Sequence, residues 1–336
     1  MTSKERFMAV LNNKKPDITP VFPLIMGFAA AQSGFTYRQY ASNGSCLAQA
    51  QVFTADKFGF DAVTSCSDAF RIAADLGGEI VYYDDTPPRI TEPIIKSFDD
   101  FDKIKTNKIP DNGRCSDRVK AVSEMVKAAG ERLFILGWVD FPFAEACSCC
   151  GVQEFMYMMA DEPELAHSIL RFLTDLVKDF ALRQLDAGAP MIGCGDAAAS
   201  LVSPEMFTEF ALPYEREVVE AIHLRGGLVK THICGNTIKT LNLILQNESD
   251  LFNVDHMVKL EDAIKVYGSA SKAVKGNLDP VTDILQADPK RTYELAKRCI
   301  SISAGYKYIL SAGCEIPTQT RDENVHALKA AANDMP

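Results

Sequence analysis

The chain has 336 residues, of which 47% are hydrophobic and 24% are charged, a globular composition that excludes a disordered or fibrous protein. Its 45 Asp and Glu outnumber 35 Lys and Arg and give a net charge of -10, which argues against a nucleic-acid or membrane partner. No run of 18 apolar residues marks a transmembrane helix, and Met1 to Phe7 lacks the apolar core of a secretory signal. We therefore expect a cytoplasmic protein whose 10 cysteines are thiols or metal ligands, because disulfides are disfavoured there.

Short apolar runs alternate with helical stretches along the whole chain. Thr2 and Glu5 have the spacing of a capping box for a first helix. The segment Asp161 to Glu164 is expected to open a long helix that runs to about Asp186, and Ser203 to Glu205 is expected to open another in the same way. Eight nearly continuous apolar runs predict parallel strands covered on both faces, at 19–22, 61–64, 133–139, 191–194, 228–234, 251–254, 273–278 and 308–311.

The alternation of strands and helices predicts the fold class. The length of the chain alone would suggest two domains of average size. No linker or change in composition, however, separates the eight apolar runs. We therefore expect a single (β/α)8 TIM barrel over residues 1–336, with a doubly wound open sheet as the alternative. The segment near 78–90 holds tyrosines and paired prolines and is expected to be an inserted hairpin.

Polar side chains follow the last five predicted strands. The active site of a barrel lies at the C-terminal ends of its strands, so these side chains are candidates for a shared site. The strand-end segments are Gly193 to Asp196, Lys230 to Asn236, Asn253 to His256, Gly276 to Asp279 and Ser311 to Glu315.

A soft metal site is the first hypothesis for this end of the barrel. His232 and Cys234 are two residues apart on one strand, so their side chains point to the same side. Cys314 arrives at the end of the eighth strand. One imidazole and two thiolates suit Zn2+, and three protein ligands leave a position open for catalysis. The alternative is a packed strand end with buried thiols.

These residues carry a family resemblance. The segments His232 to Asn236, Gly313 to Pro317 and Glu323 to Val325, together with Arg6 to Leu11 and Ser203 to Glu205, resemble the zinc-dependent corrinoid methyltransferases of the uroporphyrinogen decarboxylase superfamily. The methylcobamide:coenzyme M methyltransferases are members of that branch. The resemblance covers most of the chain and implies a uroporphyrinogen decarboxylase-like barrel.

The resemblance also implies a reaction and a set of ligands. His232, Cys234 and Cys314 would bind zinc. The enzyme would move a methyl group between a small zinc-bound substrate, either a methoxy or methyl donor or a thiol acceptor, and the cobalt of methylcobalamin or another corrinoid. No Asp-x-His-x-x-Gly motif of a corrinoid-binding domain is evident, so a separate corrinoid protein is the expected partner.

Further site residues are assigned from their places at the strand ends. Asp196, Asp255 and His256 are candidate catalytic residues, and Asp255 or His256 is a candidate fourth zinc ligand. Asn236 and Asn277 are candidates for cofactor binding. A histidine hydrogen-bonded within its own loop is the alternative for His256.

An aromatic segment and a cysteine-rich segment lie near the end of the third predicted strand. Trp138 lies near the end of the third predicted strand, and Phe141 and Phe143 follow it. These side chains favour an apolar or aromatic substrate, with core packing as the alternative. Cys147, Cys149 and Cys150 are too crowded to surround one ion and are expected to be reactive, unligated thiols.

Two other functions stay open at this point. A metal-free uroporphyrinogen-type decarboxylase would need an arginine-rich segment near the N-terminus, and Phe22 to Phe28 contains no arginine. The non-enzymatic alternative is an accessory protein that binds a corrinoid without catalysing a reaction.

Overall fold

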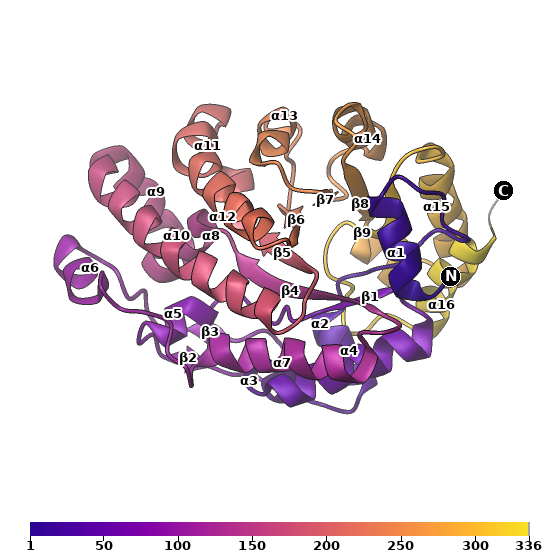
Figure 1. Cartoon of the computed structure of the whole chain (residues 1–336), viewed down its shortest axis with the longest axis horizontal. Coiled ribbons are helices and arrows are strands. Elements are labelled where there is room, and N and C mark those ends of the chain that lie inside the picture. The colour runs from indigo at the N-terminus through magenta and orange to yellow at the C-terminus, as the bar shows by residue number, and fades with distance from the viewer. Residues whose placement is uncertain (335–336) are drawn as a thin grey trace.

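Seven parallel strands form one curled sheet in the computed structural model, which describes residues 1–334 (Figure 1). The strand order is β1-β4-β5-β6-β7-β8-β9, so each strand pairs with the next one along the barrel. The strands are β1 (Ala62–Thr64), β4 (Phe134–Asp140), β5 (Met191–Gly195), β6 (Leu228–His232), β7 (Leu251–Asn253), β8 (Ala273–Leu278) and β9 (Tyr308–Ala312).

An eighth segment occupies the gap between β9 and β1. The Leu310 amide donates to the Pro20 carbonyl at 2.9 Å, and the Phe22 amide donates to the Leu310 carbonyl at 3.0 Å. On the other side the Asp61 amide donates to the Val21 carbonyl at 2.9 Å. This confirms the predicted (β/α)8 barrel. The strand predicted over 19–22 is reduced to isolated bridges, because the prolines on both sides of Val21 and Phe22 have no amide to extend the ladder.

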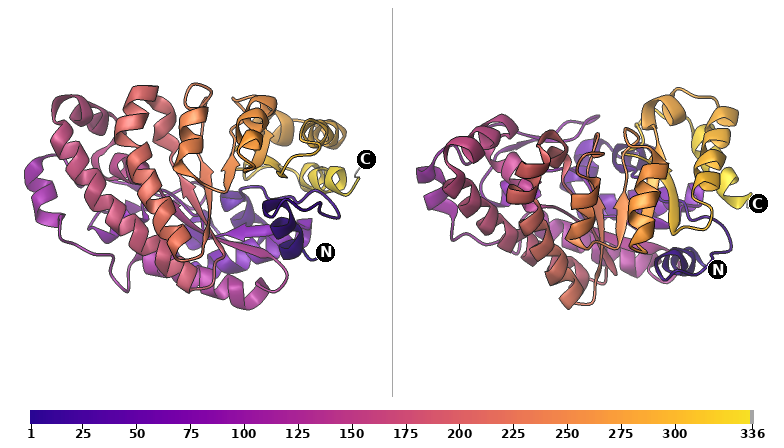
Figure 2. Two further views of the ribbon diagram at one scale, coloured as in Figure 1. Left: turned by 45° about the horizontal axis from the view of Figure 1, so that its top comes forward. Right: turned by 90° about the horizontal axis from the view of Figure 1, so that it is seen from above.

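Helices cover the outside of the sheet (Figures 1 and 2). The capping box of Thr2 and Glu5 opens α1, and Ser203 caps α11 as predicted. The helices are α1 (Ser3–Leu11), α2 (Met26–Gln32), α3 (Tyr37–Ser42), α4 (Gly44–Phe58), α5 (Arg71–Asp75), α6 (Phe98–Ile104), α7 (Arg114–Ala129), α8 (Pro142–Cys150), α9 (Val152–Asp161), α10 (Pro163–Asp186), α11 (Pro204–Phe210), α12 (Leu212–Leu224), α13 (Leu241–Ile244), α14 (Leu260–Ser269), α15 (Pro289–Ile302) and α16 (Asp322–Asn333).

Shorter elements complete the chain. Within the segment near 78–90, β2 (Ile80–Val81) pairs antiparallel with β3 (Arg89–Ile90). Single turns of 3-10 helix lie at Ala197–Leu201 and Leu245–Asn247, and a π-helical turn lies at Pro280–Leu285.

An apolar plug fills the barrel at the N-terminal ends of the strands. Phe7 of α1 is fully buried and stacks on Phe134 with ring centroids 4.3 Å apart, and its edge meets Phe22 at 5.9 Å. The first residues of the strands, including Ala62, Met191 and further apolar side chains, pack around these rings. The barrel interior is therefore closed by apolar packing at this end, and the opposite end is the one that can hold a site.

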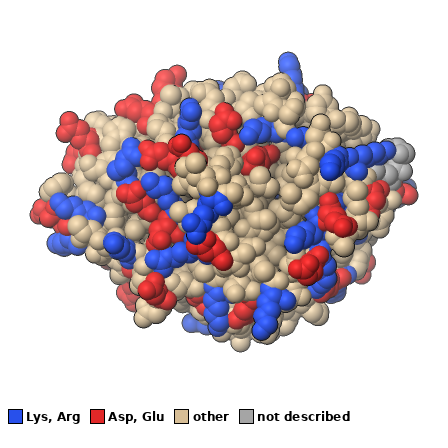
Figure 3. All heavy atoms as spheres, in the orientation of Figure 1, with Lys and Arg blue, Asp and Glu red and all other residues tan. Residues whose placement is uncertain are grey.

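The surface in Figure 3 mixes acidic and basic side chains over the face in view, without one large patch of either sign. Among residues 1–334, no helix is both long and apolar enough to cross a lipid bilayer.

Candidate metal centre

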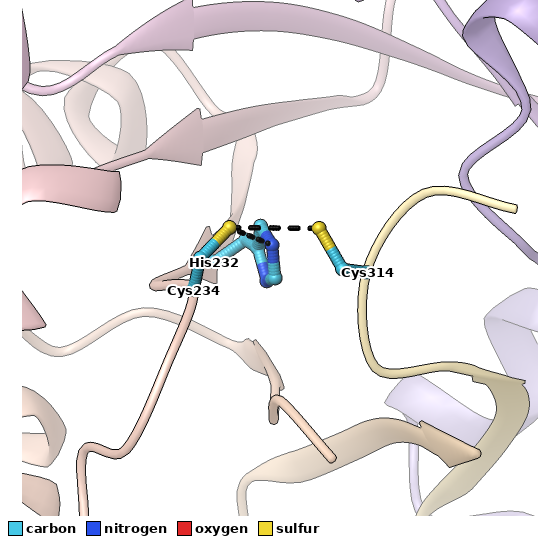
Figure 4. Close-up of side chains that lie close together, drawn as sticks. All are labelled: His232, Cys234 and Cys314. Atoms are coloured by element: carbon cyan, nitrogen blue, oxygen red, sulfur yellow. Dashed lines mark hydrogen bonds between the residues drawn. The ribbon is translucent and has the colours of Figure 1, made fainter. Parts of the chain in front are cut away.

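Three predicted ligands come together at the C-terminal end of the barrel (Figure 4). His232 is the last residue of β6, and Cys234 and Cys314 each lie two residues beyond the ends of β6 and β9. Nε2 of His232 lies 3.1 Å from Sγ of Cys234, which lies 3.5 Å from Sγ of Cys314. Two elements that are 80 residues apart in sequence thus present their donor atoms to one point.

The donor set and its spacing fit a zinc ion. Tetrahedral zinc, with bonds of about 2.3 Å to sulfur and about 2.0 Å to nitrogen, holds two sulfurs about 3.8 Å apart and sulfur and nitrogen about 3.5 Å apart. All the ligand atoms here lie within 4.8 Å of one another. His232 is buried, whereas both cysteines are only partly buried. Three ligands with one accessible side are the arrangement of a catalytic rather than a structural zinc site.

The imidazole of His232 is oriented by the backbone of the next strand. Its Nδ1 lies 3.0 Å from the carbonyl oxygen of Asn253, so Nδ1–H donates and Nε2 keeps its lone pair facing Cys234. The carbonyl of His232 itself accepts the Asp196 amide at 2.9 Å. Fixing the tautomer in this way is how proteins prepare a histidine for a metal.

The thiols of Cys234 and Cys314 have pKa values shifted in opposite directions. The hydrogen bond from Cys234 lowers the pKa of the Cys314 thiol to about 3, and His232 acts in the same direction against burial. The same hydrogen bond, together with burial, raises the pKa of Cys234. Cys314 is therefore ready as a thiolate, which is the form that binds a metal.

His256 lies near the rim with two carboxylates. Its Nδ1 is 3.0 Å from Oδ1 of Asp255, and its Nε2 is 3.6 Å from Oδ2 of Asp279. Asp255 is buried, and His256 is about one-third exposed, with 35% of its side chain accessible. Neither Asp255 nor His256 belongs to the three-residue cluster in the described chain.

Of the two predicted cofactor-binding asparagines, Asn277 on β8 contacts the neighbouring loop after β7, and Asn236 contacts its own loop. Asn277 donates through Nδ2 to the carbonyl of Val258 at 2.6 Å. Asn236 is exposed, and its Oδ1 accepts the amide of Ile238 at 3.2 Å. These contacts leave Asn277 holding the loop after β7, and Asn236 closing a turn beside Cys234.

Asp196 faces away from the cluster, toward α12. It is fully buried against Glu215, another fully buried carboxyl group. Burial and the neighbouring Glu215 raise the pKa of Asp196 well above its usual range. Burial raises the pKa of Glu215 to about 7. The hydrogen bond that Asn247 Nδ2 donates to Glu215 Oε2, 2.8 Å long, acts in the opposite direction and lowers this pKa. Asp196 therefore carries the proton between the two carboxyl groups.

Lys230 is a residue of the barrel mouth that the motif analysis missed. It lies two residues before His232 on β6, so it shares the inward face, and the spacing could have identified it. Its Nζ lies 4.5 Å from the centre of the Trp138 ring. Burial lowers the pKa of Lys230 to about 8, and four nearby thiols, including those of Cys314 and Cys234, act in the opposite direction.

The aromatic residues at and after the end of the third predicted strand lie in two different places. Trp138 points inward and packs with Leu24 and Cys66 at the mouth. Phe141 and Phe143 are fully buried in the main core outside the sheet, where Phe143 meets Phe155 edge to face. Only the indole is placed to line a substrate site.

The structure contradicts the prediction that the three cysteines of α8 are reactive thiols. Cys147, Cys149 and Cys150 are all buried. Burial is the largest influence on each thiol and raises the pKa well above the usual value for Cys147 and Cys149, and to about 12 for Cys150. Their apolar surroundings suppress the thiolate, and the expectation of reactive thiols was wrong for that reason.

Known proteins resemble the chain over its full length. The family described as uroporphyrinogen decarboxylase (URO-D) matches residues 2–335. A methylcobamide:CoM methyltransferase, MtbA, of Methanosarcina mazei is 26% identical, over 99% of this chain and 98% of the relative. A uroporphyrinogen decarboxylase of Chloroflexus aurantiacus is 24% identical, over 99% of this chain and 96% of the relative.

A solved structure shares the fold of the chain. A methyltransferase from Methanosarcina mazei superposes with a TM-score of 0.89 over 99% of both chains, at 21% sequence identity. The resemblance to methylcobamide methyltransferases that the motifs predicted is confirmed by these comparisons. The chain belongs to the uroporphyrinogen decarboxylase family.

Proposed function

We propose that this protein is a zinc-dependent methyltransferase that moves a methyl group between a small zinc-bound substrate and the cobalt of a corrinoid on a separate protein. The convergence of His232, Cys234 and Cys314 on one partly open point carries the proposal. The full-length relatives named for methylcobamide support the kind of reaction. We place the single barrel in the cytoplasm, where its ten free thiols would stay reduced.

A bound zinc ion would act at this site as a Lewis acid toward a sulfur or oxygen atom of the substrate. The chain's own residues would hold that ion with one side open to the barrel mouth. The Asn253 carbonyl keeps the His232 ring in place. His256, oriented by Asp255 and partly exposed, is the group at the rim that can exchange a proton with solvent.

The substrate is either a methoxy or methyl donor or a thiol acceptor. The names of two kinds of relative, methylcobamide:CoM methyltransferase and methylated-thiol–coenzyme M methyltransferase, favour chemistry at sulfur. The position of the Trp138 indole at the mouth is the observation that favours an aromatic donor. Asp196 is proposed to support the backbone behind His232, since it is turned away from the mouth.

Decarboxylation of a porphyrinogen is the second candidate, because decarboxylases match this chain at 24% identity. The acidic side chains that such a substrate carries would need a basic cleft. The segment Phe22 to Phe28 offers no arginine. A metal-free decarboxylation would also make no use of the three metal-ligating side chains His232, Cys234 and Cys314.

Metal analysis of the purified protein, followed by a methyl-transfer assay, tests the proposal. After zinc-replete expression we expect about one zinc per chain, and spectroscopically detected methyl exchange with a corrinoid. The variants His232→Ala and Cys314→Ser should lose both. His223→Ala is the matched control, since that histidine pairs with Asp250 before β7, at the other end of the barrel. Less than about half an equivalent of zinc in the parent would contradict the proposal.

A further inference from the structure

Lys230 is a buried cation whose hydrogen-bonding capacity is unused. The residue is 1% exposed. Within residues 1–334 its ammonium has no hydrogen-bond or ion-pair acceptor, and its contact is the face of Trp138, 4.5 Å from Nζ. An aromatic face attracts a cation but does not replace the acceptors of three N–H donors. A buried, unpaired charge is costly, so its retention points to a function.

The barrel wall is shaped to hold this ammonium and indole together. Trp138, Gly193 and Lys230 lie side by side in register on β4, β5 and β6. A Cβ atom on Gly193 would lie 2.5 Å from Cε3 of Trp138, closer than any real contact. Glycine at this position therefore lets the indole extend across β5 and lie against Lys230.

The other interior lysine shows how the fold satisfies a buried ammonium. Lys275 on β8 is also 1% exposed, but its Nζ donates to Oδ1 of Asn253 at 2.5 Å. Its Nζ also lies 4.8 Å from the ring of Phe22. Lys275 thus has an aromatic face and an acceptor, whereas Lys230 has the aromatic face alone.

The charges of the metal site do not compensate Lys230. Two thiolates, from Cys234 and Cys314, would balance the two positive charges of a zinc ion, and His232 binds metal as a neutral imidazole. The ammonium two residues before His232 then remains as excess positive charge in the mouth of an acidic protein. An anion arriving with the substrate would neutralise it.

We propose that Lys230, supported by Trp138, binds an anionic group of the small substrate, a carboxylate or a sulfonate, while the reacting sulfur or oxygen lies at the metal site. This inference rests on the proposed function and deepens it. The enzyme would select small anionic substrates over neutral ones of the same shape.

Binding to the zinc-loaded protein tests this directly, because Trp138 is the single tryptophan of the chain and its fluorescence reports on the site. Matched pairs of probes are 2-mercaptoethanesulfonate or 3-mercaptopropionate against 2-mercaptoethanol, and 3-methoxybenzoate against 3-methoxybenzyl alcohol. The sulfonate and carboxylate probes separate the two anion classes. We expect the anionic member of at least one pair to bind about 10- to 100-fold more tightly, as for a charge-assisted hydrogen bond.

Substitutions then assign the preference to Lys230. Lys230→Met should abolish it and leave affinity for the neutral probe within about twofold. Lys230→Arg should keep most of it, and Lys275→Met, the matched interior control, should keep all of it. If Lys230→Met binds neither probe, the arginine variant decides, and loss of the preference there overturns the proposal.

Two results in the parent protein separate this inference from the proposed function. Equal affinity and equal kcat/KM for anionic and neutral substrates, with methyl transfer intact, overturn the role of Lys230 alone. An anion preference without zinc-dependent methyl transfer in any corrinoid assay supports the anion site and refutes the methyltransferase.

Discussion

The buried carboxyl pair behind the metal site should make the protein less stable as pH rises. Glu215 of α12 is fully buried and accepts one hydrogen bond from Asn247, and its second oxygen has no partner among the described residues apart from the carboxyl of Asp196. Burial raises the pKa of Glu215 from its ordinary value of 4.5 to about 7. Between these values the folded protein holds a proton that the unfolded chain has already released.

The size of the effect follows from that difference in pKa. Each unit corresponds to about 1.4 kcal/mol, so ionising Glu215 in place costs the folded state about 3 kcal/mol once the pH exceeds 7. Below pH 4.5 this cost vanishes because both states are protonated. Glu215→Gln removes the ionisation, keeps an oxygen for Asn247 and supplies an N–H for Asp196.

Urea unfolding of the zinc-saturated protein at pH 5 and pH 8 measures this effect. Glu215→Gln should be more stable than the parent at pH 8 by about 3 kcal/mol, with most of the gain gone at pH 5. Glu220→Gln, at an exposed position of the same helix, should stay within about 0.5 kcal/mol of the parent at both pH values. A gain for Glu215→Gln that is equal at pH 5 and pH 8 would refute the reasoning.

Three other substitutions probe the barrel itself. Phe7→Ala removes the stacked ring at the closed end and should cost about 3–5 kcal/mol of unfolding free energy, while zinc content measured by atomic absorption stays unchanged. Gly193→Ala places a methyl group against Trp138, so a loss of about 1–3 kcal/mol should accompany a shifted fluorescence maximum; unchanged emission would contradict the observed packing. Arg71→Met leaves the carboxylate of Asp140 buried without its ion-pair partner, and calorimetry should show about 3–5 kcal/mol of destabilisation.

The metal site could be predicted because strand geometry is local. His232 and Cys234 share a face by their spacing alone, and Cys314 is brought to them by the closure of the barrel. Both inferences require only that the strands and their C-terminal ends are located correctly, and neither depends on the details of side-chain packing. The same rule would have found Lys230, which has the same spacing from His232.

Asp196 shows what the sequence could not decide. It follows β5 directly, and a polar residue at a strand end was expected to face the mouth. The register places Gly195 opposite His232 on the inward face, so Asp196 points outward to Glu215. Which of two neighbouring residues faces inward depends on the pairing of two strands that are far apart in sequence.

Burial was the second property that the sequence left undetermined. Cys147 and its neighbours lie in the helix that follows β4, near the end of the barrel where reactive groups are found, but α8 places them in the packed layer outside the sheet. For these cysteines tertiary packing, rather than local pattern, set the outcome. The shortened strand at Val21 has a local cause, because the prolines on both sides lack the amides that would extend the ladder.

The two ends of the barrel divide stability and function between them. At the closed end the rings of Phe22 and Phe134 contact Phe7. The open end holds buried polar groups that reduce stability, namely the ammonium of Lys230 and the carboxyl groups of Asp196 and Glu215. Of these groups only Lys230 shares the inward face of β6 with His232, so an incoming substrate can neutralise it. The carboxyl pair faces α12, on the other side of the sheet from the substrate, so the cost of ionising Glu215 stays. Substrate binding therefore offsets the free-energy cost of burying Lys230 but not that of ionising Glu215. An anionic ligand should raise the unfolding free energy of the parent more than that of Lys230→Met. The stability difference between Glu215→Gln and the parent should be nearly the same with and without that ligand.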